Sequence, residues 1–147
     1  MTAERDKATA EAQIRELIDD WAKAVRTKDV SGVMVHYAPD NVTFDLAPPL
    51  ISTAADAEGL QAWFSTWRGP LVYEIRHLNI TASDDAAFGH SLTRLSGTKT
   101  DGEKADIWFR QTLGFRKTGG EWRIAHQHES VPFYMDGSYR AAVDLQP

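Results

Sequence analysis

The feature of this sequence that most constrains its fold is a pair of long hydrophobic runs joined by a glycine turn. The runs cover residues 106–117 and 121–133, and Thr118-Gly119-Gly120 separates them. Both are rich in β-branched and aromatic residues, and two such runs around a short glycine turn predict a β-hairpin. In the first run the odd-numbered positions from 107 to 115 are apolar, as expected for a strand with one buried face, except for Gln111. A polar side chain on a buried face either meets a partner or lines a cavity, so Gln111 is a candidate site residue.

The length and composition of the chain indicate one globular domain, residues 1–147. We expect a flexible N-terminus (1–8) and a polar tail (134–147) that lies over the surface. The formal net charge of −5 argues against binding to nucleic acid or to an anionic membrane. The chain has no cysteine, which excludes disulfides and thiolate sites. It shows no apolar signal-peptide core and no run that could span a bilayer, so we expect a cytoplasmic protein. It also has no glycine-rich phosphate loop, and we expect no cofactor.

The chain before the hairpin predicts three helices and then strands. Apolar residues at helical spacing predict an amphipathic helix over residues 9–27. The other expected elements are helices at 30–37 and 56–67, a short strand at 41–46, and strands at 71–82 and 86–97. Helices followed by an antiparallel meander predict an α+β fold, with the helices on one face of the sheet.

Two stretches carry a family resemblance. Residues 29–45 resemble the second helix and first strand of the ketosteroid isomerase-like, or SnoaL-like, proteins of the nuclear-transport-factor-two-like superfamily, and residues 120–133 resemble their closing strand. The likeness extends from the first helix to Phe133. It implies a conical, cystatin-like barrel, with the N-terminal helices packed in the concavity of a strongly curved, mostly antiparallel sheet. It also implies a homodimer through the outer sheet face. It does not fix the reaction, because the superfamily holds isomerases, cyclases, dehydratases and non-catalytic domains.

The resemblance also implies a catalytic set. Asp45 stands where true ketosteroid isomerases keep their general base, and partial desolvation at an apolar mouth raises the pKa of a carboxyl group. The alternative for Asp45 is a cap on the following loop. Trp21 and Gln111 stand at the positions of the two oxyanion donors, and an indole N–H and an amide can both donate hydrogen bonds. The alternative for Trp21 is core packing.

The closing strand contains His126 and His128, which as alternate strand residues share a face. A zinc or iron site needs a third ligand, and the sequence supplies none at a diagnostic spacing, so we expect no metal. The two histidines are also the sole support for a further functional hypothesis, an oxygenase subunit or metal enzyme, which is weaker than the two hypotheses given at the end of this section. Hydrogen bonding on the sheet face that meets a second subunit is the other role open to them.

Which face of the closing strand looks inward is open. Trp122 and Ile124 share parity with the histidines, so hydrophobicity alone would turn His128 inward. The resemblance instead implies that Ala125, Gln127 and Glu129 line the cone, and a single β-bulge would decide between the two. The candidate substrate contacts are Tyr37, Trp63, Phe109, Gln127, Glu129 and His128.

These residues lead to one functional hypothesis and one rival. The first is an enzyme of the ketosteroid isomerase-like or polyketide cyclase-like type, which moves a proton on a small hydrophobic carbonyl compound without a cofactor. In it Asp45 is the base, and Glu129 is a second carboxylate that could pair with it. The alternative for Glu129 is an exposed residue at the end of the strand. The rival is a non-catalytic ligand-binding or association (dimerisation) module of the same fold.

Overall fold

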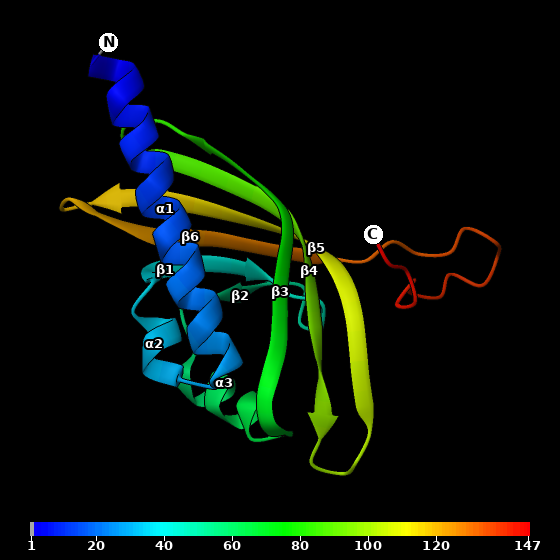
Figure 1. Cartoon of the computed structure of the whole chain (residues 1–147). Helices are drawn as coiled ribbons and strands as arrows, with labels where there is room; N and C mark the ends of the chain where they lie inside the picture. The colour runs from blue at the N-terminus through cyan, green and yellow to red at the C-terminus, as the bar shows by residue number, and fades with distance from the viewer. Residues whose placement is uncertain (1) are drawn as a thin grey trace.

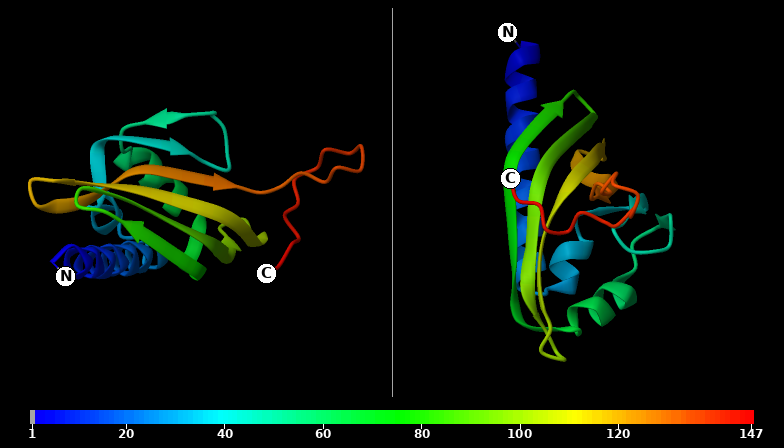
Figure 2. Two further views of the ribbon diagram at one scale, coloured as in Figure 1. Left: turned by 90° about the horizontal axis from the view of Figure 1, so that it is seen from above. Right: turned by 90° about the vertical axis from the view of Figure 1, so that its right-hand side faces the viewer.

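The computed structural model describes residues 2–147, as one long and two short helices against a curled six-stranded sheet (Figure 1). The predicted α+β class is confirmed, and the sheet is curled but not closed into a barrel (Figure 2). The elements in chain order are α1 (Thr2–Arg26), α2 (Val30–Met34), β1 (Tyr37–Phe44), β2 (Ser52–Thr53), α3 (Ala57–Phe64), β3 (Trp67–Ala82), β4 (Ala86–Lys99), β5 (Lys104–Thr118) and β6 (Glu121–Ser130). No helix in this described part of the chain combines the length and apolar character needed to cross a membrane.

The sheet is mostly antiparallel, as expected, with one parallel pair. Its strand order is β2-β1-β6-β5-β4-β3, and β1 runs parallel to β6. The β5–β6 hairpin turns at Gly119 and Gly120, whose φ angles of 59° and 82° fit the tight turn that the two glycines predict. Because the parallel pairing sets Phe44 beside His128, Asp45, the first residue after β1, follows directly beside Glu129 of β6.

Helix α1 lies across the concave face and packs against β3, α2 and β6 (Figure 1). Its buried side chains recur at helical spacing, so one apolar stripe faces the sheet: Ile14, Leu17, Ile18, Trp21 and Val25. Residues 2–8, expected to be flexible, form the first two turns of this helix. The two short helices end earlier than expected, because strands β1 and β3 already begin at Tyr37 and Trp67.

A β-bulge in β6 decides which of its side chains face inward. Phe115 of β5 pairs with Ile124, whereas the preceding Gly114 pairs with His126, so Ala125 has no partner of its own on β5. A bulge of one residue reverses the facing of the strand beyond it. Trp122 and Ile124 are therefore buried before the bulge, and Gln127 faces inward after it. Ala125, expected to line the cone, is the bulge residue.

The tail does not lie over the surface as expected. Residues after β6 continue outward beyond the end of the strand and form an irregular loop away from the sheet (Figures 1 and 2).

Candidate functional site

The concave face of the sheet and all three helices surround a cavity of about 460 Å³. Its walls are mainly apolar, with side chains from α1, α2, α3, β4 and β5: Trp21, Val25, Val33, Met34, Leu60, Trp63, Leu95 and Phe109. The polar groups gather on the β1, β3 and β6 side: Tyr37, Asn41, Asp45, Tyr73, Gln127 and Glu129. An apolar cavity of this size with a few convergent polar groups is typical of a small-molecule site.

Glu129 is the centre of the polar side. Its Oε1 accepts hydrogen bonds from Gln127 Nε2 at 2.6 Å and from Gln111 Nε2 at 3.0 Å. Burial is the largest of the effects that together raise the pKa of Glu129 to about 7; the charge of Asp45 also raises this pKa, and the hydrogen bonds from Gln127 and Gln111 lower it. Its Oε2 receives no hydrogen bond from residues 2–147.

One chain of hydrogen bonds reaches Glu129 from helix α1. Trp21 Nε1 donates to Tyr37 Oη at 3.2 Å, and Tyr37 Oη donates to Gln127 Oε1 at 2.6 Å. Gln127 then donates to Glu129. The indole N–H of Trp21 and the hydroxyl proton of Tyr37 are thus both engaged within the protein, although both rings line the cavity.

A second chain reaches Glu129 through the sheet. Gln111 is only 2% exposed and is absent from the cavity wall. Its Oε1 accepts from Thr93 Oγ1 at 3.3 Å, and its Nε2 donates both to Glu129 and, at 2.8 Å, to Tyr73 Oη. The lone polar residue on the buried face of the strand therefore has partners, and it orients two groups that do line the cavity.

Tyr73, like Asn41, lines the cavity but was not among the candidates from the sequence. Its Oη accepts from Gln111, and its own hydroxyl proton has no acceptor in the part of the chain that the structure describes. The ring stands edge-on to Trp21, with 5.6 Å between ring centroids. Burial raises the pKa of Tyr73 well above its ordinary value, so the phenol stays neutral and can donate into the cavity. The available signal was its spacing on β3: Tyr73 stands two residues after the buried Leu71 and therefore shares its inward face.

Asp45 lies at the mouth of the cavity, on the exposed segment after β1. Partial burial raises its pKa. Together with Glu129 it also borders a shallow depression outside the cavity, formed with Phe44, residues 46–50 and His128.

The two histidines of β6 lie outside the cavity. His128 is exposed and borders the depression together with Glu129, but it does not line the 460 Å³ cavity. His126 Nδ1 lies 2.7 Å from the backbone oxygen of Val42 and links β6 to β1. Among residues 2–147 the structure shows no group of three His, Asp or Glu side chains arranged to hold a metal ion.

Comparison with known families settles the classification. Residues 14–134 match the model of the SnoaL-like domain. The chain belongs to the SnoaL-like family. The membership that the resemblance implied is thereby confirmed. No curated protein matches the sequence of this SnoaL-like chain.

Solved structures show the same fold. An NTF2-like protein of unknown function from Pseudomonas putida is 35% identical, with a TM-score of 0.85 over 95% of this chain and 98% of that one. A ketosteroid isomerase-like protein from Erwinia carotovora is 25% identical, with a TM-score of 0.69 over 81% and 93%. The association domain of C. elegans CaMKII is 15% identical, with a TM-score of 0.67 over 84% and 97%, and this likeness shows the fold alone. The SnoaL-like fold thus occurs in proteins with different roles.

Proposed function

We propose that this SnoaL-like protein is an enzyme that transfers a proton on a small hydrophobic carbonyl compound, without a cofactor, as an isomerase or cyclase. The observation that carries the proposal is the position of Glu129 where two chains of hydrogen-bond donors end, on the wall of an apolar cavity. With a pKa of about 7, this carboxyl group is populated in both protonation states near neutral pH, as a general acid–base catalyst requires.

In the proposed reaction, Glu129 Oε2 takes a proton from the carbon next to the carbonyl group. The electron pair of that C–H bond forms a carbon–carbon double bond, the π pair of the carbonyl group moves onto its oxygen, and the resulting enolate oxygen accepts a hydrogen bond from Tyr73 Oη. Return of the proton from Glu129 to another carbon of the enolate completes an isomerisation. For a cyclisation, the enolate carbon attacks a second carbonyl group of the same molecule, and the alkoxide formed there takes the proton back from Glu129.

The other candidates take roles that fit their contacts. Asp45 is the second carboxylate at the mouth, where it raises the pKa of Glu129 and can accept or return a proton. Gln111 and Trp21 are positioning residues, because their donors are engaged by Glu129, Tyr73 and Tyr37. Trp63 and Phe109 contact the hydrophobic part of the substrate.

We further propose that the protein is a homodimer through the outer face of its sheet. Val72 of β3 and Phe88 of β4 are nearly half exposed. The guanidinium of Arg76 lies over the ring of Trp108 of β5, with 4.8 Å between its central carbon and the ring centroid. Aromatic and arginine side chains on a half-apolar face are typical of protein interfaces.

The test begins with a library of hydrophobic ketones, screened by the shift that each ligand causes in the melting temperature. Compounds that bind are then incubated with the enzyme in deuterated water, and proton exchange next to the carbonyl is followed by NMR. We expect Glu129→Gln to lower the exchange rate roughly 10²–10⁴-fold, the usual contribution of a general base. Glu121→Gln, on the same strand but exposed, is the matched control and should exchange like the wild type.

A pair of tyrosine variants tests the donor. Tyr73→Phe should lower the exchange rate roughly 10-fold or more while leaving ligand affinity nearly unchanged. Tyr37→Phe should chiefly destabilise the protein, by about 1–3 kcal/mol, because it leaves Gln127 Oε1 without its donor. Exchange by Glu129→Gln at the wild-type rate would overturn the proposal. Binding without exchange in the wild type would instead support a ligand-binding module.

A further inference from the structure

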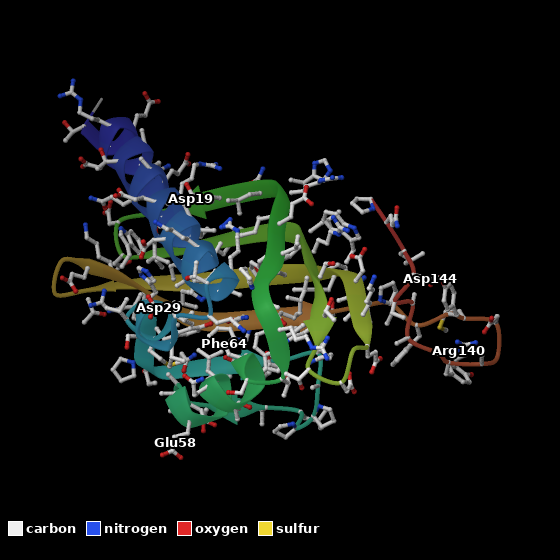
Figure 3. All side chains as sticks on the ribbon, turned by 60° about the horizontal axis from the view of Figure 1, so that its bottom comes forward. Asp19, Asp29, Glu58, Phe64, Arg140 and Asp144 are labelled. Carbon is white, nitrogen blue, oxygen red and sulfur yellow. The ribbon has the colours of Figure 1, made fainter. Side chains whose placement is uncertain are left out.

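The segment after β6, residues 131–147, forms an arm that extends away from the rest of the molecule. We call it the C-terminal arm. In Figure 1 and in the left view of Figure 2 it continues past the end of β6, away from the sheet and helices. Figure 3 shows Arg140 and Asp144 on this arm, well separated from the labelled residues of the helices.

The arm has a defined internal structure. Tyr134 N donates to Arg140 O at 2.8 Å, and Ala142 N donates to Pro132 O at 2.8 Å, so the chain folds back on itself. The carboxylate of Asp136 accepts hydrogen bonds from the backbone and hydroxyl of Ser138 at the tip. These bonds hold the arm in one shape without help from the sheet.

The side chains that this shape presents are unusually apolar for a free loop. Met135 is 83% exposed, Tyr139 68% and Phe133 62%, and Val143 and Leu145 are about half exposed. Surface loops are normally polar, whereas grouped exposed apolar side chains mark interaction sites. Phenylalanine, tyrosine, methionine and arginine are also the residues enriched where two proteins meet.

The outer face of the sheet is the complementary surface on this chain. It offers the half-exposed apolar side chains of Val72 and Phe88. Arg110 of β5, exposed on the same face, bonds Ser130 Oγ at 3.1 Å and has no carboxylate partner within residues 2–147. The side chains of the arm include two carboxylates, Asp136 and Asp144, and one guanidinium, Arg140, so their formal charges sum to a negative value. The arm of one chain leads away from its own sheet, so it is free to reach another.

We infer that the C-terminal arm is exchanged between two copies of this chain, each arm seated on the outer sheet face of the other. A two-fold dimer makes the contact reciprocal, so each copy both gives an arm and receives one. The inference extends the proposed homodimer and is independent of the chemistry in the cavity. The acidic arm side chains then lie against a face on which Arg110 lacks a carboxylate partner.

The test is light scattering after size-exclusion chromatography, over a dilution series of the full chain. We expect a dimer whose dissociation constant rises roughly 100-fold or more in the double variant Phe133→Ser/Tyr139→Ser, because interface aromatics carry much of the binding energy. Leu50→Ser, which removes a 95% exposed apolar side chain elsewhere, is the matched control and should leave the dissociation constant unchanged. Melting curves check that each variant is folded.

A second double variant, Val72→Ser/Phe88→Ser, tests the receiving surface and should also weaken the dimer. A monomeric wild type overturns the inference, as does a dimer that the arm variant leaves intact. A dimer weakened by the arm variant but not by the face variant overturns the seating on the outer sheet face. Proton exchange by the dissociated arm variant separates the two proposals, since the cavity of each copy is lined by its own residues.

Discussion

At the scale of single residues, the ionisation of Glu129 ties the stability of the protein to pH. Its folded-state pKa of about 7 lies above its ordinary value of 4.5, so the folded state binds more protons than the unfolded state between these values. The contribution of Glu129 to the free energy of unfolding is therefore fully present below about pH 4.5, and it is lost as pH rises through 7. We expect the loss to be about 2–3 kcal/mol, allowing for the partial exposure of the side chain.

Urea unfolding of the wild type and Glu129→Gln at several pH values between 4.5 and 8 measures this effect. The free energy of unfolding of the wild type, relative to the variant, should decrease across this range. Glu121→Gln should track the wild type at every pH. Parallel curves for the wild type and Glu129→Gln would show that the carboxyl group titrates at its ordinary pKa.

At the scale of elements, the contact between strands β3 and β4 depends on the absence of a side chain. A Cβ atom added to Gly97 would lie 2.9 Å from the ring of Trp67, closer than packed atoms approach. Gly97→Ala should therefore lower the free energy of unfolding by about 1–3 kcal/mol. Gly89→Ala, on the same strand, meets neighbours only at 3.6 Å and should be nearly neutral. Chemical denaturation of both variants provides the comparison, and equal effects would contradict the steric argument.

At the scale of the whole molecule, Trp21 joins the helical layer to the sheet and to the polar network. Its ring is 2% exposed, contacts Tyr73 edge-on, and donates to Tyr37. Trp21→Ala should lower the free energy of unfolding by about 3–5 kcal/mol, as large-to-small core changes do. Trp21→Phe keeps most of the packing and should cost about 1–2 kcal/mol for the lost hydrogen bond. Equal losses in thermal or urea unfolding would mean that the hydrogen bond, and not the packing, dominates.

Local patterns in the sequence determined the elements and several site residues. The two glycines, flanked by β-branched and aromatic runs, predicted the β5–β6 hairpin, since a tight turn and alternation are properties of neighbouring residues. The lone Gln111 on an apolar face indicated a polar cluster on the concave side of the sheet for the same reason. The resemblance to SnoaL-like proteins identified the fold and drew attention to Asp45 and Glu129, which the structure places as neighbours on the cavity wall.

Only the tertiary structure decided which side chains face the cavity and which donors remain available. The bulge at Ala125 exists because β6 pairs with β5 on both sides of it, and one unpaired residue turns Gln127 and Glu129 inward after Trp122 and Ile124. The hydrogen bonds from Trp21 to Tyr37 and from Gln111 to Tyr73 join residues far apart in the chain. Such pairings depend on register and packing across strands, which residue types and local spacing do not specify.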